Sequence, residues 1–217
     1  IFPGIELIHL YGTTETAPLA TGWCYDNSVR DKKLLRSCGQ ALPGVEICIF
    51  DKEGHKLPCG DVGEIAISGA NVMMGYWNKP METQAVLRNG WYYSGDLGYA
   101  DVDDYIYLVD RAKDMIITGG ENVYSSEVEA CLYQHPDVHE CAVVGVPDET
   151  YGEALLAVVV TTPGAVLTDA MLIAHCRDRI GGYKIPRLYQ FVDELPKSAM
   201  NKILKNELRR IFSAHNS

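Results

Sequence analysis

Short apolar and alternating runs dominate the first half of the chain. The apolar run 5–10 is expected to be a short buried strand, the alternating runs 45–50 and 62–69 are two more, and the runs 91–96 and 105–109 are a further two. Residues 51–54 form a predicted hairpin turn, and one helix is expected at residues 79–88, opened by Pro80. Many short strands separated by tight turns predict a barrel or a sandwich.

The pattern changes after about residue 112, where helical and strand periodicities alternate. A glycine-closed hairpin is expected at 115–124, with a helix at 125–133 whose cap is a serine. Further elements are expected as strands at 141–146, 154–161 and 188–192, a helix at 168–180, and a last amphipathic helix beginning near Asn201. This mixture predicts a small α+β domain after the β-rich part.

Composition excludes several classes of protein. The chain has 217 residues, 47% of them hydrophobic, and a formal net charge of −10, which disfavours a nucleic acid or an anionic membrane as the main partner. No run is long enough for a membrane-spanning helix, and the first residues do not have the basic-then-apolar pattern expected of a signal peptide. Because Ile1 is not a start methionine, we expect a fragment that lacks its N-terminal part.

Cysteine and histidine usage predicts a reduced, cytoplasmic protein without a zinc site. The seven cysteines are scattered singly, their number is odd and no Cys-x-x-Cys occurs. His135 and His139 have the spacing of two ligands on one helical face, but Pro136 lies between them and disfavours a continuous helix.

The segment Tyr-Gly-Thr-Thr-Glu-Thr, residues 11–16, follows the first expected strand and concentrates hydrogen-bonding groups beside a glycine. A loop at a strand end can present N–H and hydroxyl donors to an anion, and Glu15 can hold a hard cation such as Mg²⁺. A hydroxyl-rich turn without a ligand is the alternative interpretation.

Four further segments carry candidate chemistry. Asp96 lies between glycines, where a carboxylate can accept both hydroxyls of a ribose. The charged run 110–114 is expected to be a hinge at the domain boundary, with Arg111 as a donor to ribose or phosphate. The glycine pair at 119–120 lets backbone pass close to a ligand, and Lys202 is expected in the first turn of the last helix, near a bound anion. Taken alone, a turn aspartate, a solvated linker, a hairpin turn and a surface lysine explain these segments equally well.

The order of the motifs is more specific than any one of them. They are Tyr-Gly-Thr-Thr-Glu at 11–15, Gly-Glu-Ile at 63–65, Tyr-Ser-Gly-Asp-Leu at 93–97, Asp-Arg-Ala-Lys-Asp at 110–114, Gly-Gly-Glu-Asn-Val at 119–123, Glu-Val-Glu at 127–129, and Pro-Lys at 196–197 with Lys202. This series resembles the adenylate-forming enzyme superfamily across essentially the whole chain. Within the superfamily it is most similar to the C-terminal part of an AMP-forming acyl-CoA synthetase.

The resemblance implies a fold and a reaction. Residues 1–112 would be a β-barrel-like remnant of the large N-terminal domain, and residues 113–217 a small, mobile C-terminal lid. The family uses ATP and Mg²⁺ to convert a carboxylic acid into an acyl-adenylate, and CoA then displaces AMP. Both steps develop charge on phosphate or carbonyl oxygens, so fixed donors and the metal ion are expected to do most of the catalytic work.

The resemblance also implies roles for individual residues. In the nucleotide site Tyr11 and Gly12 would lie at the adenine, Thr14 would donate to the α-phosphate, Glu15 would hold Mg²⁺, and Asp96 and Arg111 would hold the ribose. Lys113 would be the hinge, and Lys202 the catalytic lysine that reaches the α-phosphate and the acid carboxylate. Gly119 and Gly120 would line the pantetheine tunnel, and Tyr183, Lys184 and Arg187 would contact the CoA nucleotide.

The chain departs from the family pattern in three places. Lys202 follows Asn201 where glycine is usual, and the turn at Asp103 and Asp104 lacks a frequent glycine. The Gly/Ser/Thr-rich loop that grips pyrophosphate is not among these residues, so we expect the fragment alone to be inactive. A carrier-protein-loading adenylation domain, a non-catalytic nucleotide-binding module and a luciferase-like oxidation remain alternatives. The sequence does not show whether the acid is fatty or aromatic, and it does not indicate the oligomeric state. The ending His215-Asn216-Ser217 is not a peroxisomal signal.

Overall fold

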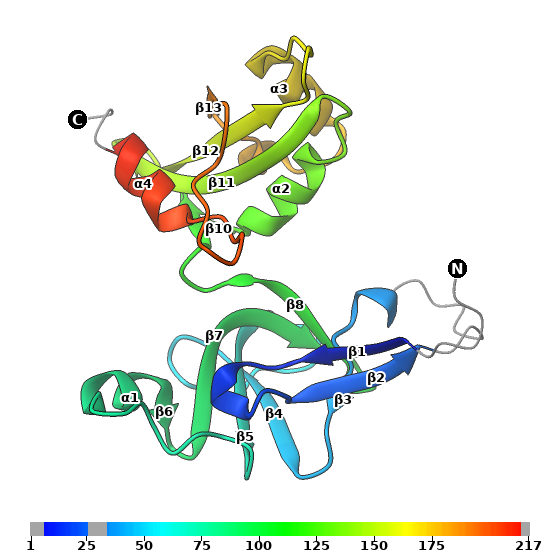
Figure 1. Ribbon diagram of the computed structural model, residues 1–217, viewed down its shortest axis with the longest axis vertical. Helices are drawn as coiled ribbons and strands as arrows, with labels where there is room; N and C mark the ends of the chain where they lie inside the picture. Colours follow the sequence, from blue (N-terminus) through cyan, green and yellow to red (C-terminus); the bar gives the residue numbers. More distant parts are fainter. Residues whose placement is uncertain (1–6, 26–33, 214–217) are drawn as a thin grey trace. The chain divides into compact units, whose positions relative to one another are not determined.

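The computed structural model describes residues 7–25 and 34–213 (Figure 1). The chain divides into two compact units, Ile1–Ala112 and Lys113–Ser217. Residues 5 and 6 of the first expected strand and the last four residues lie outside the described part.

The first unit is built from antiparallel strands. Its strands are β1 Leu7–Tyr11, β2 Thr21–Tyr25, β3 Gln40–Ala41, β4 Val45–Phe50, β5 Gly63–Gly69, β6 Leu87–Arg88, β7 Trp91–Ala100 and β8 Ile106–Arg111. One α-helix, α1 Pro80–Val86, and two 3-10 turns, Thr14–Thr16 and Leu34–Arg36, complete it. The strands form a sheet β1-β2-β3 and a second sheet β4-β5-β7-β6 in which β8 pairs with β7.

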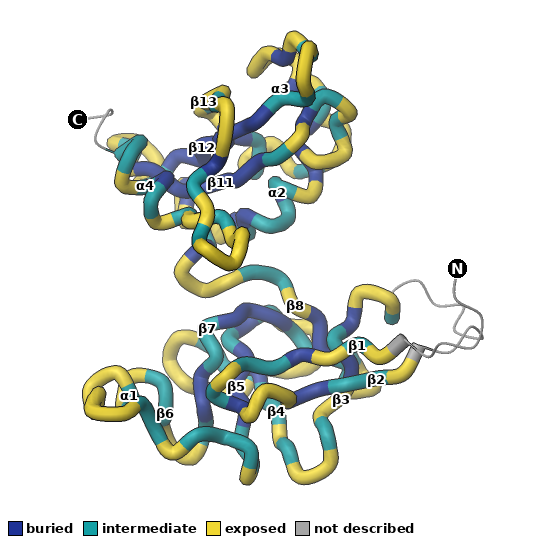
Figure 2. The backbone as a smooth tube through the Cα atoms, in the orientation of Figure 1, coloured by how far each residue is buried: buried dark blue, intermediate teal, exposed yellow. Residues whose placement is uncertain are grey.

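Alternation along the strands creates the core of this unit. Ile65 and Ile67 of β5 are fully buried, and Ile49 of β4 and Ile106 of β8 are buried in the same cluster. Figure 2 shows buried segments along the strands of this unit. The register shifts between β5 and β7 and again between β7 and β8, and Figure 1 shows β7 strongly bent. Bulges of this kind curl a sheet, so the predicted barrel is present as a half-barrel.

The second unit mixes strands and helices. Its elements are β9 Ile116–Thr118, β10 Glu121–Val123, α2 Ser125–Leu132, β11 Val138–Asp148, β12 Gly152–Thr161, α3 Asp169–Arg177, a 3-10 turn Gly182–Lys184, β13 Leu188–Phe191 and α4 Lys205–Ser213. The sheet order is β10-β9-β12-β11, and β13 pairs in parallel with β12.

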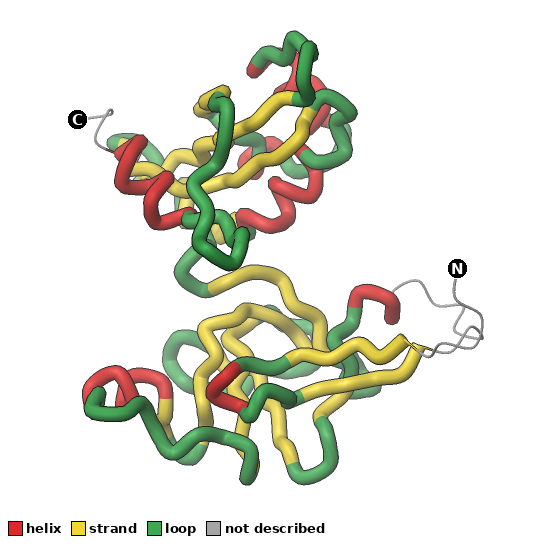
Figure 3. Tube along the Cα trace, in the orientation of Figure 1, coloured by secondary structure: helices red, strands yellow, loops and turns green. Residues whose placement is uncertain are grey.

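The central strands β11 and β12 are buried along most of their length. Helices pack on both faces of their sheet, so both faces need apolar side chains (Figure 3). On one face Val128 and Leu132 of α2 and Leu172 of α3 meet the sheet. On the other face Leu208 of α4 packs against it, with Phe212 partly buried beside it. The α+β architecture expected from the sequence is therefore confirmed.

Two details of the sequence-based prediction are wrong. The last helix begins at Lys205 rather than near Asn201, because Asn201 has a left-handed backbone (φ 61°) that a helix cannot continue through. Lys202 is consequently outside the helix rather than in its first turn, where it was expected. The cap of α2 is Tyr124, which makes no capping hydrogen bond; Ser125 is the first helical residue and its hydroxyl accepts from Lys205 instead.

The described residues contain no helix that is long and apolar enough to cross a membrane. All seven cysteines are free, and the ring of His135 packs edge-on against that of His175. In residues 7–25 and 34–213, no group of three or more His, Cys, Asp or Glu residues is arranged to hold a metal ion.

Candidate functional site

A buried carboxylate lies where three strands of the first unit meet. The Tyr11 hydroxyl at the end of β1 donates to Asp96 Oδ2 over 2.9 Å, and Arg111 Nε lies 2.8 Å from Asp96 Oδ1. Asp96 on β7 and Arg111 on β8 are paired in register, so the sheet itself sets this contact. Both carboxylate oxygens are thus held in place, while half of the Arg111 side chain stays exposed.

Burial, with a smaller contribution from the Asp96 carboxylate, raises the pKa of Tyr11 well above the usual range of a phenol. Tyr11 therefore remains a hydrogen-bond donor at neutral pH. The Asp96 backbone N–H donates to Ser94 Oγ over 3.1 Å, which fixes the strand beside the carboxylate.

The loop after β1 leaves no room for a side chain at Gly12. A Cβ atom there would lie 1.9 Å from the carbonyl oxygen of Pro18, so the glycine allows the loop to close on itself. The Thr16 hydroxyl accepts from the Thr13 N–H over 2.9 Å and donates to the Thr13 carbonyl over 3.1 Å. Thr16 is buried and structural, whereas Thr14 is exposed at the start of the 3-10 turn.

Glu15 is held by a tyrosine that the sequence motifs do not include. The Tyr76 hydroxyl donates to Glu15 Oε1 over 2.8 Å, and the Met73 N–H donates to the Glu15 carbonyl over 2.8 Å. Partial burial opposes ionisation of Glu15, but hydrogen bonds, above all that from Tyr76, outweigh it and lower its pKa. Burial and the neighbouring Glu15 raise the pKa of Tyr76 to about 12.

The loop that carries Glu15 directly follows Tyr11, which is bound to Asp96. Burial raises the pKa of the nearby Tyr92, and the charges of Glu15 and Asp96 raise it further. The first unit therefore gathers Tyr11, the Gly12–Glu15 loop, Asp96 and Arg111 into one site. An ionised, oriented carboxylate suits a hard cation, and because Glu15 is a single ligand, phosphate and water oxygens would complete the shell of an Mg²⁺ ion.

In the second unit the predicted glycine turn is tied to a tyrosine and an arginine. Gly119 and Gly120 have left-handed backbones (φ 59° and 84°), and the Gly119 N–H donates to the Tyr151 carbonyl over 2.9 Å. The guanidinium carbon of Arg187 lies 3.4 Å from the centre of the Tyr151 ring. Tyr151 thus brings Arg187 and the glycine turn together. None of the sequence motifs includes Tyr151, and the only signal near it in the sequence is the acidic turn that precedes it.

Lys184 has a different environment from Arg187. Its ammonium lies 2.7 Å from both carboxylate oxygens of Glu127 on α2. Burial opposes protonation of Lys184, but Glu127 outweighs it and raises the pKa of this lysine. The ring of Tyr183 lies 5.6 Å from the same ammonium and is 46% exposed. Lys184 is therefore paired within the unit rather than presented alone to a phosphate.

The predicted catalytic lysine lies at the tip of a loop between β13 and α4. Lys202 is exposed, and its side chain makes no hydrogen bond or ion pair with another residue of the described ranges. At the start of the loop Lys197 Nζ lies 2.5 Å from Glu140 Oε1 on β11. Lys113, the predicted hinge, is exposed at the first position of the second unit.

Comparisons with known proteins identify both parts of the chain. The AMP-binding enzyme family matches residues 1–77, and the AMP-binding enzyme C-terminal domain matches residues 127–202. The chain is 44% identical over 209 residues to 2-succinylbenzoate–CoA ligase of Geobacillus kaustophilus, covering 96% of this chain and 42% of that protein. It is 42% identical over 206 residues to long-chain-fatty-acid–CoA ligase of Bacillus subtilis, covering 94% of this chain and 36% of that protein.

The same relationship holds among solved structures. The ATP-bound crystal structure of MatB from Rhodopseudomonas palustris matches with a TM-score of 0.87 and 37% identity, over 97% of this chain and 41% of that one. The chain thus spans about two fifths of the length of these relatives. It belongs to the AMP-binding, adenylate-forming enzyme family, and its relatives are acyl-CoA ligases.

Proposed function

We propose that the intact protein is an AMP-forming acid–CoA ligase, of which this chain supplies the C-terminal part. In the first step the oxygen of a carboxylate attacks the α-phosphorus of ATP, forming an acyl-adenylate and releasing pyrophosphate. In the second step the CoA thiol, losing its proton, attacks the acyl carbon, and AMP leaves with the electron pair of the broken C–O bond.

The observation that carries this proposal is the buried Asp96 carboxylate held between Tyr11 and Arg111. A fixed carboxylate can accept both hydroxyls of a ribose, and the exposed part of Arg111 can donate to the same sugar. Tyr11 would lie against the adenine beside Gly12, and the exposed Thr14 hydroxyl would donate to the α-phosphate.

Glu15 would hold Mg²⁺, because its carboxylate is oriented and kept ionised by Tyr76. The bound ion would neutralise phosphate charge as pyrophosphate leaves. Glu15 would fix the position of the Mg²⁺ ion relative to the ribose site.

The second unit would act as a lid that turns about Lys113 between the two steps. Lys202, which is unpaired among the described side chains, would reach the α-phosphate and the acid carboxylate during adenylation. The backbone at Gly119 and Gly120 would then line the pantetheine path. Arg187, oriented by Tyr151, would meet the CoA nucleotide, with Tyr183 and Lys184 nearby.

The acid is aromatic or aliphatic, since the relatives include a 2-succinylbenzoate ligase and a long-chain fatty-acid ligase. By resemblance, most of the acyl pocket and the phosphate-gripping loop of the family would lie outside these residues. We therefore expect the 217-residue chain alone not to consume ATP in the presence of an acid.

The test offers the intact protein ATP, Mg²⁺ and a panel of aromatic and fatty acids, with and without CoA, and identifies products by mass spectrometry. The proposal predicts acyl-CoA and AMP from at least one acid, and acyl-adenylate when CoA is omitted. Acyl-adenylate that never becomes a CoA thioester would indicate a carrier protein as acceptor. The absence of adenylate from every acid would support a non-catalytic nucleotide-binding module.

A further inference from the structure

The loop that carries Lys202 is closed by its own backbone. The Ser198 N–H donates to the Lys202 carbonyl over 2.8 Å, and the Leu204 N–H donates to the Pro196 carbonyl over 2.8 Å. Lys197 and Ile203 form an antiparallel bridge across it. These hydrogen bonds fix the shape of the loop. The position of the loop on the second unit depends on the contacts that the residues at its two ends make with other elements.

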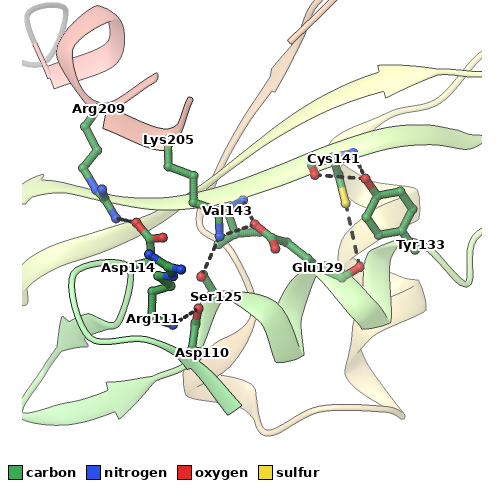
Figure 4. A network of polar contacts seen from close by, with 10 residues as sticks. All are labelled: Asp110, Arg111, Asp114, Ser125, Glu129, Tyr133, Cys141, Val143, Lys205 and Arg209. Atoms are coloured by element: carbon green, nitrogen blue, oxygen red, sulfur yellow. Dashed lines mark hydrogen bonds and ion pairs between the residues drawn. The ribbon is translucent and has the colours of Figure 1, made fainter. Parts of the chain in front are cut away.

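The end after Lys202 is anchored by Lys205, the first residue of α4 (Figure 4). Lys205 Nζ lies 2.7 Å from Glu129 Oε1 and donates to Ser125 Oγ over 2.8 Å, so it binds two residues of α2. The Val143 N–H on β11 donates to the same Glu129 oxygen over 2.7 Å. The side chains of Lys205 and Glu129 are 16% and 17% exposed, which makes this a largely desolvated ion pair.

A second anchor lies one turn further along the same face of α4. Arg209 Nη2 lies 3.0 Å from Asp114 Oδ1, and the Asp114 side chain is only 12% exposed. Asp114 is the second residue of this unit, directly after Lys113. Helix α4 is therefore tied at once to α2, to β11 and to the segment where the unit begins. By contrast, Arg210 on the same helix pairs with Glu207 on the exposed side.

We propose that Lys205 and Arg209 are positioning residues, which fix the Lys202 loop to the start of the second unit so that both move as one rigid body. The role of Lys202 in this inference rests on the proposed function. Because the Lys202 side chain makes no hydrogen bond or ion pair with another described residue, its reach is set by the backbone that Lys205 holds three residues later. A loosened anchor would leave the rest of the unit folded and misplace only the lysine.

The first experiment needs no activity and uses hydrogen exchange on the protein. Lys205→Met is expected to speed exchange of the Ser198, Asn201 and Leu204 amides about tenfold or more, while amides of β12 keep their protection. If Lys205→Met does not fold, Glu129→Gln provides a milder variant, because it retains an acceptor for the Val143 N–H. It is expected to speed exchange of the same loop amides. Arg210→Ala is the matched control and should change none of these rates. Unchanged loop exchange in both anchor variants would overturn the proposal.

The second experiment separates the two half-reactions in the intact protein. Lys205→Met and Arg209→Ala are expected to slow ATP–pyrophosphate exchange, by up to ~100-fold for Lys205→Met, because small displacements of a catalytic group are costly. Thioester formation from supplied acyl-adenylate and CoA should remain near that of the unaltered protein. An equal loss in both half-reactions would show that the anchors only stabilise the fold and would contradict the positioning role. Inactivity of the unaltered protein would refute the proposed function instead, and the exchange experiment would still decide whether the loop is anchored.

Discussion

At the scale of single residues, hydrogen bonds set the charge and the direction of the side chains in the proposed nucleotide site. Tyr76 donates to Glu15 and lowers its pKa, although burial works in the opposite direction. Asp96 has a donor at each oxygen, from Tyr11 and Arg111. Such prior orientation removes the need to order these groups when a ligand arrives.

Tyr76→Phe should therefore raise the pKa of Glu15 toward its ordinary value, as followed by carboxylate NMR titration. In the unaltered protein the lowered pKa stabilises the fold above the unfolded-state pKa, and this contribution is lost as the pH falls through the folded-state pKa. The variant should thus lose ~1 kcal/mol of unfolding free energy at neutral pH, and progressively less in acid.

Tyr99→Phe is the matched control for that change. The Tyr99 ring stacks on Tyr107 at 4.9 Å, and its hydroxyl makes no hydrogen bond within the described ranges. It should leave the Glu15 titration unchanged. A Glu15 pKa that is the same in Tyr76→Phe and in the unaltered protein would contradict the role assigned to Tyr76.

The sequence could indicate Asp96 and Glu15 because each lies in a short motif of glycines and polar residues. Glu15 follows the end of β1, whereas Asp96 lies inside β7, which continues to Ala100 beyond the strand expected at 91–96. It could not indicate Tyr76, which reaches Glu15 across 61 positions, or Lys205, which reaches Ser125 across 80. Contacts over such separations depend on how the sheets fold back, and no local pattern encodes them. Lys184 was predicted to contact a ligand. Its ion pair with Glu127 on α2 could not be predicted from the sequence, because the two residues are far apart along the chain.

At the scale of elements, local backbone geometry explains both what was predicted and what was missed. The apolar pattern located β4 and β5 closely. In β5 the successive residues Ile65, Ala66 and Ile67 are all buried, so burial there is not confined to one face. The existence of the last helix was also predicted, but its start was placed too early. Asn201 stands where the family usually has glycine, and Asp104 lies in the turn that lacks a frequent glycine; both have left-handed backbones (φ 61° each). Asn and Asp are the residues that replace glycine there at least cost.

Asn201 should accordingly tolerate glycine better than alanine. Asn201→Gly is expected to leave the unfolding free energy unchanged or slightly raised, while Asn201→Ala should be ~1 kcal/mol less stable than the glycine variant. Denaturant unfolding measures both, with Asn122→Ala in β10 as a control that should be nearly neutral. Equal stability of the glycine and alanine variants would mean that the left-handed turn before Lys202 is not maintained.

At the scale of the whole molecule, the two units divide the proposed chemistry. The first unit holds the groups suited to ribose, phosphate and Mg²⁺, and the second holds the exposed Lys202, the glycine turn and Arg187. The change in periodicity near residue 112 predicted two structural units. A β-rich segment and a segment of mixed helices and strands bury their apolar residues in different arrangements, so each is expected to have its own core. The identity of the acid could not be predicted, since no described residue was assigned to an acyl pocket.

The most direct test of the central claim is the fate of oxygen from the acid. The intact protein would be given a carboxylic acid labelled with heavy oxygen, ATP, Mg²⁺ and CoA, and the released AMP would be analysed by mass spectrometry. An acyl-adenylate route predicts that AMP carries one labelled oxygen and that pyrophosphate carries none. Acyl-CoA formed with unlabelled AMP, or with label in inorganic phosphate and ADP as the other product, would contradict the account.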